Sequence, residues 1–153
     1  SRDIKVFGAR DQGDVLIVTG FDGREKKWRF PKKSKAKRGR QSKLHKRTRL
    51  ILRDLFRRDI ILEEVSLPGS NTTTRPSILF ADFFIPSRNL IVEVHGRQHY
   101  EFVDFYHKTK SGFYKSQARD RDKIRWCRLN KIDIVTLKYT GDDDEWKTEI
   151  LNR

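Results

Sequence analysis

Short apolar stretches alternate along the chain with polar segments, and their spacing predicts two kinds of element. Alternation with a period of two among β-branched and aromatic residues predicts strands, whereas apolar residues three or four positions apart predict amphipathic helices. Strands are predicted at 15–19, 26–30, 60–67, 78–85, 90–95 and 133–139. Helices are predicted at 43–58, at 115–130 and from 143 onward, and 100–112 is predicted as a loop or an irregular helix.

Turn-forming residues join some of these strands. Gly20, Asp22 and Gly23 separate the first two strands, and 86–89 separates the strands at 78–85 and 90–95, so both pairs are predicted as hairpins. The order of elements predicts an α/β protein with a mixed central sheet flanked by helices. The predicted segments are an N-terminal β-hairpin extension at 1–30, a basic linker at 31–41 and a main domain at 42–153.

Positive charge is concentrated in one part of the sequence. The chain has 35 Lys and Arg against 21 Asp and Glu, a formal net charge of +14. Residues 24–58 hold 17 of these basic residues and only Glu25 and Asp54 as acids, so the rest of the chain is nearly neutral. A basic block predicts a polyanion partner, because Lys and Arg that neutralise phosphates release condensed counterions. The alternatives are a solvated tail or a localisation signal.

The linker at 31–41 has almost no apolar side chains, so we predict that it is flexible and becomes ordered only on a phosphate backbone. The start of the helix at 43–58 adds further positive charge, and two polar residues after the strand at 90–95 suit phosphate or base contacts. The predicted DNA contacts are therefore Lys32, Lys33, Lys35, Lys37, Arg38, Arg40, Lys43, Arg47, Arg97 and Gln98.

Two carboxylates interrupt predicted strands that are otherwise apolar. Asp82 lies in the strand at 78–85 and Glu93 in the strand at 90–95, where an unpaired buried charge would be costly. A cation would remove that cost, and Mg²⁺ prefers oxygen ligands. We therefore predict a Mg²⁺ site, in which Mn²⁺ could substitute, formed by Asp82, Glu93 and the backbone carbonyl of Val94. Such a metal polarises a phosphoryl oxygen and activates water for hydrolysis.

Two histidines and a third carboxylate accompany these acids. Period-two alternation places His95 on the same sheet face as Glu93, and His99 lies just beyond the end of that strand. A neutral imidazole there could serve as a general base, and Asp120 could orient it or help to hold the cation. The alternative for each histidine is a structural or surface residue. The predicted catalytic residues are Asp82, Glu93, His95, His99 and Asp120.

The order of these residues resembles a known group of nucleases. Asp82 followed by Glu93-Val94-His95 is similar to the D…(D/E)xK signature of the PD-(D/E)xK restriction-like nucleases, with His95 in the place of the lysine. The chain more closely resembles the Vsr mismatch endonucleases and the phage homing endonucleases described as EDxHD enzymes. The motifs that carry this resemblance, all between 42 and 140, are Ser66-Leu67-Pro68-Gly69, Arg75-Pro76, Asp82-Phe83, Val94-His95-Gly96, His99 and Ala118-Arg119-Asp120-Arg121-Asp122.

The resemblance implies a restriction-endonuclease-like fold for 42–153 and a role for each matching residue. It implies that Asp82 binds Mg²⁺, that His95 and His99 take part in catalysis, and that Asp120 supports them.

Three departures from the family pattern change the expectations. The glutamate that the family carries on its first helix is matched best by His45. The single Cys127 cannot rebuild the structural zinc site of Vsr enzymes, so no structural zinc is expected. Arg97-Gln98 replaces the aromatic pair that Vsr inserts into a mismatch, which favours a homing or recombination nuclease over mismatch repair.

These observations predict a Mg²⁺-dependent DNA endonuclease of phage homing or recombination type, acting as a monomer or a homodimer. A non-catalytic DNA-binding module on a degenerate nuclease fold is the alternative. An RNA-binding or ribosomal-type protein would explain the basic block but neither Asp82 nor Glu93.

The predicted location follows from what the sequence lacks. No apolar run is long enough for a membrane span, and the N-terminus lacks the apolar core of a signal peptide. We therefore expect an intracellular protein without membrane contact, located in the cytoplasm of a bacterial host if a phage encodes it. The sequence starts at Ser1 and contains no Met. We therefore expect that its numbering begins inside a longer natural chain.

Overall fold

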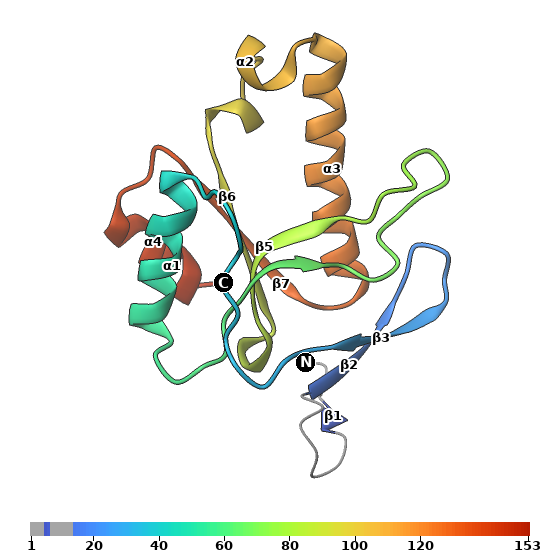
Figure 1. The fold of residues 1–153 in the computed structure, drawn as a ribbon, viewed down its shortest axis with the longest axis vertical. Helices are drawn as coiled ribbons and strands as arrows, with labels where there is room; N and C mark the ends of the chain where they lie inside the picture. Colours follow the sequence, from blue (N-terminus) through green and yellow to red (C-terminus); the bar gives the residue numbers. More distant parts are fainter. Residues whose placement is uncertain (1–4, 7–13) are drawn as a thin grey trace.

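The computed structural model describes residues 5–6 and 14–153, which form a three-stranded sheet and a four-stranded sheet with helices (Figure 1). In chain order the elements are β1 (Lys5–Val6), β2 (Asp14–Thr19), β3 (Glu25–Arg29), α1 (Lys43–Leu55), β4 (Leu62–Ser66), β5 (Phe80–Ile85), the 3-10 helix η1 (Pro86–Arg88), β6 (Leu90–His95), the 3-10 helix η2 (Arg97–His99), α2 (Asp104–His107), α3 (Lys110–Leu129), β7 (Asp133–Lys138) and α4 (Asp143–Leu151). The predicted mixed α/β class is confirmed.

The larger sheet has the strand order β4-β5-β6-β7. β5 pairs antiparallel with β4 and β6, whereas β6 and β7 run parallel. A parallel pair needs a long connection between its strands, and η2, α2 and α3 supply it. β6 is one of the two inner strands of this sheet, and every residue from Leu90 to His95 is buried.

Two apolar clusters cover the two faces of this sheet. α1 and α4 pack on one face, where Leu52 and Trp146 meet Phe83. α3 and the strands β2 and β3 pack on the other face, where Trp126 meets Phe84. Neighbouring residues of a strand point to opposite faces, which is why Phe83 and Phe84 belong to different clusters. Figure 1 shows α1 and α4 together on one side of the sheet and α3 on the other.

The predicted N-terminal hairpin is confirmed for β2 and β3, which pair from Val15↔Arg29 to Thr19↔Glu25. β1 adds a third strand that the sequence pattern did not predict. Residues 1–4 and 7–13 of the predicted segment 1–30 lie outside the described residues.

The hairpin shares its apolar core with the rest of the chain. The Trp28 ring stacks on Phe84 with centroids 4.5 Å apart and meets Trp126 edge-on at 5.3 Å. The Asn130 side chain accepts from the Thr19 N–H and donates to the Thr19 carbonyl. The hairpin therefore covers one face of the larger sheet instead of packing as a separate unit.

The basic segment at 31–41, predicted as a flexible linker or loop, has backbone contacts with β4 in the structure. The Lys35 N–H donates to the Ile61 carbonyl, and the Lys35 carbonyl accepts from the Glu63 N–H, so this segment pairs with the start of β4. The Lys37 N–H also donates to the Glu63 carboxylate at 3.0 Å. β4 lies at the edge of its sheet, and an edge strand offers backbone groups that a passing segment can satisfy without DNA.

The helix at 115–130 begins five residues earlier than predicted, at Lys110. Thr109 precedes it as the N-cap, and its side chain accepts from the Gly112 N–H. Within 100–112 the structure has the short helix α2 followed by this cap. In contrast, α1 ends at Leu55, three residues before the predicted end.

A buried carboxylate joins α1, β4 and the basic segment. Glu63 accepts from Arg49 at 2.6 and 2.7 Å, and it lies 2.8 Å from Nε2 of His45. Burial alone would raise the pKa of Glu63, but the hydrogen bonds from Arg49, the Lys37 N–H and His45 outweigh burial and lower it to about 2. The ionised carboxylate is therefore the stable form in the folded chain.

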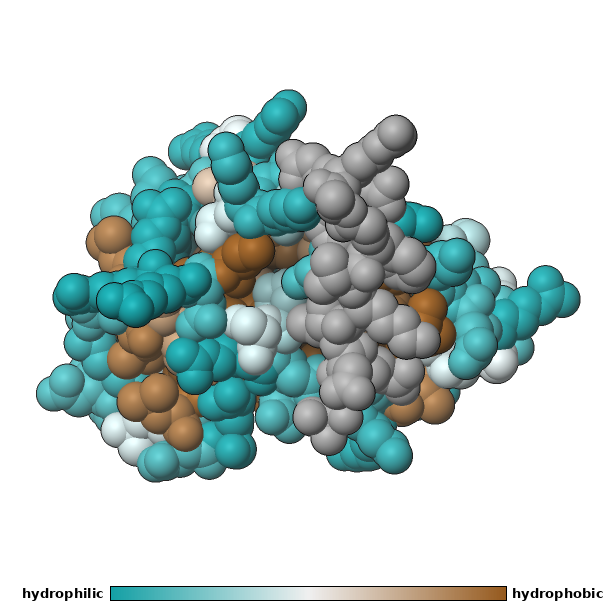
Figure 2. All heavy atoms as spheres, turned by 90° about the horizontal axis from the view of Figure 1, so that it is seen from below, coloured by the Kyte–Doolittle hydropathy of each residue, from teal (hydrophilic) through white to brown (hydrophobic). Residues whose placement is uncertain are grey.

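Most of the visible surface at the end opposite α2 is hydrophilic, with smaller hydrophobic areas between (Figure 2). None of the helices in the described part of the chain combines the length and apolar character needed to cross a membrane.

We predict that Glu63→Gln lowers the free energy of unfolding by about 3 kcal/mol at pH 7, because it leaves the Arg49 guanidinium without its carboxylate. The folded pKa lies below the unfolded one, so this stability is present above the unfolded pKa and is lost as pH falls toward the folded value. The difference between the two chains should shrink from pH 5 to pH 3. Urea unfolding measures it, with Glu25→Gln on the exposed side of β3 as the control. A loss that does not change with pH would contradict this account.

Candidate active site

The strands β5 and β6 stop pairing where the two predicted carboxylates lie. Their pairing runs from Ile85↔Leu90 to Phe83↔Val92 and does not continue to Asp82 and Glu93. Instead, the Asp82 N–H donates to Glu93 Oε2 at 2.7 Å, and the Val94 N–H donates to Asp82 Oδ2 at 3.0 Å. Carboxylate oxygens thus satisfy the backbone groups that the separating strands leave open.

The opposite side of β5 is irregular at the same position. The pairing of β4 with β5 skips Glu64, which would face Asp82, between Glu63↔Phe83 and Val65↔Ala81. Glu64 has a φ of 54°, in the left-handed region that non-glycine residues rarely adopt. Asp82 is consequently outside the regular ladder on both sides of its strand.

Lys123 supplies a positive charge that the sequence analysis did not predict. Its Nζ lies 2.7 Å from Glu93 Oε1, and its side chain is mostly buried. Burial would lower the pKa of Lys123, but the charges of Glu93 and Asp82 and the hydrogen bond raise it. The signal that could have identified it is helical spacing, because Asp120 and Lys123 are three residues apart on α3 and therefore share a face.

The two carboxylates have very different affinities for a proton. Burial and the neighbouring Glu93 charge raise the pKa of Asp82 to about 7, although Lys123 opposes them. Burial also acts to raise the pKa of Glu93, but the charge of Lys123 and the interaction with His95 oppose it. Together with the hydrogen bonds from Lys123 and from the Asp82 N–H, they lower the pKa of Glu93 to about 2. Glu93 is the permanent anion of the pair, and ionising Asp82 beside it has a cost that a cation could offset.

The two predicted histidines lie against each other. The rings of His95 and His99 stack with centroids 3.9 Å apart and planes 9° apart. His99 Nδ1 is 2.8 Å from Asp120 Oδ2. An ionised carboxylate can only accept, so a neutral His99 ring paired with it would carry its proton on Nδ1 and keep the lone pair of Nε2 available.

His95 is held differently. Its Nε2 is buried and has no hydrogen-bond partner among the described residues. It lies 3.6 Å from Glu93 Oε1 and 3.8 Å from Asp120 Oδ1, so the ring stands between two carboxylates. A proton on both ring nitrogens would make these contacts ion pairs.

His95, His99 and Asp120 also have their ligand atoms within 4.8 Å of one another, close enough to share a metal ion. Nitrogen donors of this kind suit zinc, iron or nickel better than Mg²⁺. An imidazole binds a metal along the lone pair in its ring plane, and two nearly parallel stacked rings cannot both point at one ion. One ring would have to turn before all three residues could share a metal.

The other predicted metal ligands take part in the site through internal hydrogen bonds. Val94 contributes its N–H to Asp82, and both oxygens of Glu93 already accept hydrogen bonds. His45, the residue at the place of the family's first-helix acid, lies on the other face of the sheet. Its ring stacks on Phe83 and its Nε2 contacts Glu63. It therefore cannot reach Asp82.

The predicted DNA contacts divide into two groups. Lys32, Lys33, Lys35, Arg38, Arg40, Lys43 and Arg97 are exposed, and Lys37 and Gln98 are half-buried. Arg47 is occupied inside the protein: it donates to Asp143 at 2.6 Å and to the Gly141 carbonyl at 2.8 Å, and its guanidinium stacks on Trp146. The prediction that Arg47 contacts DNA is therefore not supported by its position.

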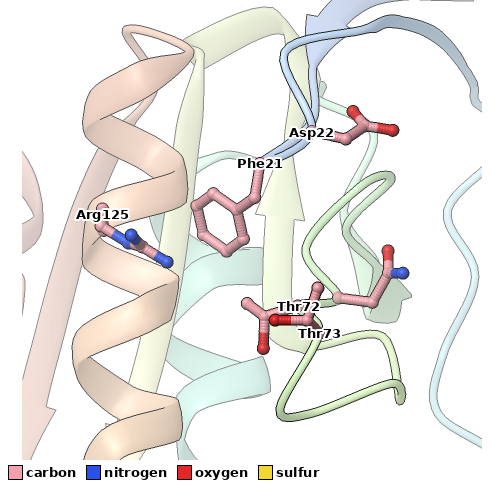
Figure 3. Close-up of a pocket in the computed structure, with 6 residues that line it drawn as sticks. Phe21, Asp22, Thr72, Thr73 and Arg125 are labelled. Carbon is pink, nitrogen blue, oxygen red and sulfur yellow. The ribbon is translucent and has the colours of Figure 1, made fainter.

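The candidate chemistry lies in a shallow pocket of about 280 Å³. Its lining includes Asp82, His99, Asp120 and Lys123. A larger pocket, of about 440 Å³, lies farther along α3 and is lined by Phe21, Asp22, Asn71, Thr72, Thr73 and Arg125 (Figure 3). The Arg125 guanidinium lies 4.1 Å from the Phe21 ring. This larger pocket has one carboxylate and no histidine, whereas His95, His99 and Asp120 together line a further pocket of about 360 Å³.

Comparison with known proteins finds partial relatives only. The chain is 39% identical over 62 residues to the uncharacterized protein 307L of Invertebrate iridescent virus 6, covering 40% of this chain and 32% of that protein. It is 41% identical over 59 residues to the uncharacterized protein 033L of Invertebrate iridescent virus 3, covering 39% and 30%. It is 34% identical over 65 residues to the uncharacterized protein 094L of Frog virus 3, covering 42% of each.

The chain thus matches less than half the length of each of these relatives. No family model matches it, and no solved structure matches it. The relatives are iridovirus proteins and not phage proteins, so they give no support to the expectation of a bacterial host.

We predict that Asp82→Asn raises the free energy of unfolding at pH 8 by about 1 to 3 kcal/mol when EDTA keeps metals away. The folded pKa of Asp82 is raised, so its favourable contribution is present at low pH and is lost as pH rises through about 7. Asparagine keeps an oxygen for the Val94 N–H and carries no charge. The gain should shrink as pH falls below 7 and disappear only near the unfolded pKa of 3.8, and urea unfolding at pH 8 and at about pH 4 tests this. An equal effect at both would contradict a raised pKa, and Glu25→Gln again serves as the control.

Proposed function

We propose that this chain is a metal-dependent DNA endonuclease with an active site of the PD-(D/E)xK kind. The observation that supports this best is the pair of carboxylates at the point where β5 and β6 separate, next to Lys123 and the His99–Asp120 pair. A restriction-endonuclease-like fold is part of the proposal, supported by the mixed sheet with helices on both faces.

The residues at the site fit a hard divalent cation. Asp82 is an oxygen donor that lines the pocket, and its raised pKa reflects a negative charge that a cation would offset. Mg²⁺ suits such a site because it prefers oxygen ligands and retains several waters, and Mn²⁺ accepts the same donors. Asp82 would hold the ion, whereas Glu93 would act behind it by fixing the Asp82 backbone. When bound, the cation would polarise the phosphoryl oxygen and offset developing charge.

The protein side chains account for the proton transfer. His99 can accept a proton from water at Nε2, since Nδ1 is bonded to Asp120, and the Asp120 carboxylate then stabilises the imidazolium. The stacked His95 ring fixes the plane of His99. Lys123 brings an ammonium to Glu93 from a helix, while the related signature carries its lysine on the strand at the place of His95.

The type of nuclease is also a proposal. Arg97 and Gln98 after β6 are polar, which favours a homing or recombination nuclease over a mismatch enzyme. All five predicted catalytic residues belong to one chain, so a monomer would nick one strand and a homodimer could cut two. Such an enzyme would act inside the cell that holds its DNA.

A DNA-binding module without catalysis is the second candidate, because His45 is on the wrong face to replace the acid of the family's first helix. It would bind DNA with strong salt dependence and show no cleavage with Mg²⁺ or Mn²⁺.

Cleavage of supercoiled plasmid tests the active site. We expect Asp82→Asn to reduce the rate in Mg²⁺ by about 100-fold or more, because the amide is a poor ligand for a hard cation. Asp82→Asn keeps the hydrogen bond from Val94, so circular dichroism should show an intact fold. Glu25→Gln is the matched control and should cleave normally. Undiminished cleavage by Asp82→Asn would rule out this site.

Salt dependence of duplex binding tests the basic segment. Replacing Lys33, Arg38, Arg40 and Lys43 by Gln should reduce the slope of log K against log salt by about 0.9 for each phosphate that the variant no longer neutralises. The effect should be similar on unrelated sequences. Arg47→Ala is the contrasting variant: it should lower stability by about 1 to 2 kcal/mol and leave the slope unchanged. An unchanged slope in the quadruple variant would exclude this segment from DNA binding.

A further inference from the structure

Aromatic side chains are exposed together in the segment that follows His99. Tyr100, Phe105, Tyr106 and Tyr114 are exposed to 39%, 85%, 60% and 61%. They are four of the five large aromatic residues that are exposed in the described chain, the fifth being Phe80. Exposed rings are unfavourable in water, so their concentration in one segment indicates a surface that binds a partner.

The segment is held in place from its inner side. The Val103 N–H donates to His107 Nδ1 at 3.0 Å, and the His107 ring lies against Phe102 and Phe113. On the outer side, the rings of Phe105 and Tyr106 meet edge-on at 5.2 Å. Figure 1 shows α2 projecting beyond the sheet beside the first turns of α3. The outer rings are thus presented on a fixed support.

Positive charge accompanies these rings. Lys108, Lys110 and Lys115 are exposed in the segment 100–115, whose acidic residues are Glu101 and Asp104. Arg119 and Arg121 follow on α3, on either side of Asp120. Rings alone would fit an apolar protein surface. Rings interspersed with cations fit nucleic acid better, because bases stack on aromatic faces while Lys and Arg meet the phosphates.

Exposed aromatic rings also favour unpaired nucleotides over a regular duplex as the partner. In a regular duplex each base is covered on both faces by its neighbours, so a protein ring finds a free base face only where bases are unpaired or splayed. We infer that the segment 100–115 is a base-stacking platform that binds unpaired nucleotides of DNA next to the cleavage site. The inference takes its partner from the proposed function, but binding does not need cleavage.

Equilibrium binding in EDTA tests the platform without cleavage. The probes are a fluorescein-labelled 20-mer single strand and the duplex of the same sequence. We expect the double variant Phe105→Ala with Tyr106→Ala to lose tenfold or more in affinity for the single strand. Its affinity for the duplex should change less than twofold. The slope of log K against log salt should be unchanged for the single strand, because stacking releases no counterions.

Matched variants separate stacking from other contacts. Phe105→Trp should retain single-strand affinity, whereas Phe105→Leu should lose it, because leucine is apolar but offers no ring face. Lys108→Gln with Lys110→Gln should reduce the salt slope. Leu50→Ala, at an exposed position on α1, should have no effect.

The outcomes distinguish this inference from the proposed function. Absence of binding to any DNA would refute the proposed function together with the platform. Normal single-strand affinity in the double alanine variant, with DNA binding otherwise intact, would overturn the platform alone. An equal loss on duplex and single strand, or retention by Phe105→Leu, would also overturn it, because either result indicates a contact other than base stacking.

Discussion

The candidate site depends on one pair of reciprocal contacts between side chains and backbone. Where β5 and β6 separate, Asp82 accepts from the Val94 N–H, and Glu93 accepts from the Asp82 N–H. Each carboxylate takes the place that a carbonyl of the neighbouring strand would have in a continued ladder. The contacts fix both acids on rigid strands, and they bring two negative charges close together in a buried place. This buried negative charge is costly unless a neighbouring element neutralises it.

The helix α3 supplies the positive charge that balances these two carboxylates. Lys123 neutralises Glu93 and leaves Asp82 as the group whose ionisation has a cost, which is the condition under which a carboxylate gains most from a cation. One turn away, Asp120 fixes the tautomer of His99. A single helix face thus connects the charge balance of the carboxylate pair with the orientation of the proposed base. In the proposed nuclease, cation binding and water activation are therefore coupled through α3.

In the proposed nuclease, two surfaces of different chemistry would engage DNA around this site. The basic segment runs along the edge of β4 and acts through charge, so its contribution falls as salt rises. The aromatic segment around α2 offers ring faces, whose contribution is largely independent of salt. Glu63 links the first of these surfaces to the protein core through Arg49 and the Lys37 N–H. A fold that holds the basic segment in advance avoids the entropy of ordering it on the ligand.

The sequence by itself determined the elements and the chemical types at the site. An apolar, β-branched run after the turn at 86–89 predicted β6 with its observed bounds, and carboxylates inside apolar strands marked Asp82 and Glu93 because buried charge is costly. Only the tertiary structure decided which distant groups meet them. Lys123 donates a hydrogen bond to Glu93, 30 residues away in the sequence, and Arg47 donates one to Asp143, 96 residues away. The position of the segment at 31–41 likewise depends on its backbone hydrogen bonds with the edge strand β4. Local periodicity records which face of an element is buried, whereas ion pairs and edge contacts depend on how those faces pack together.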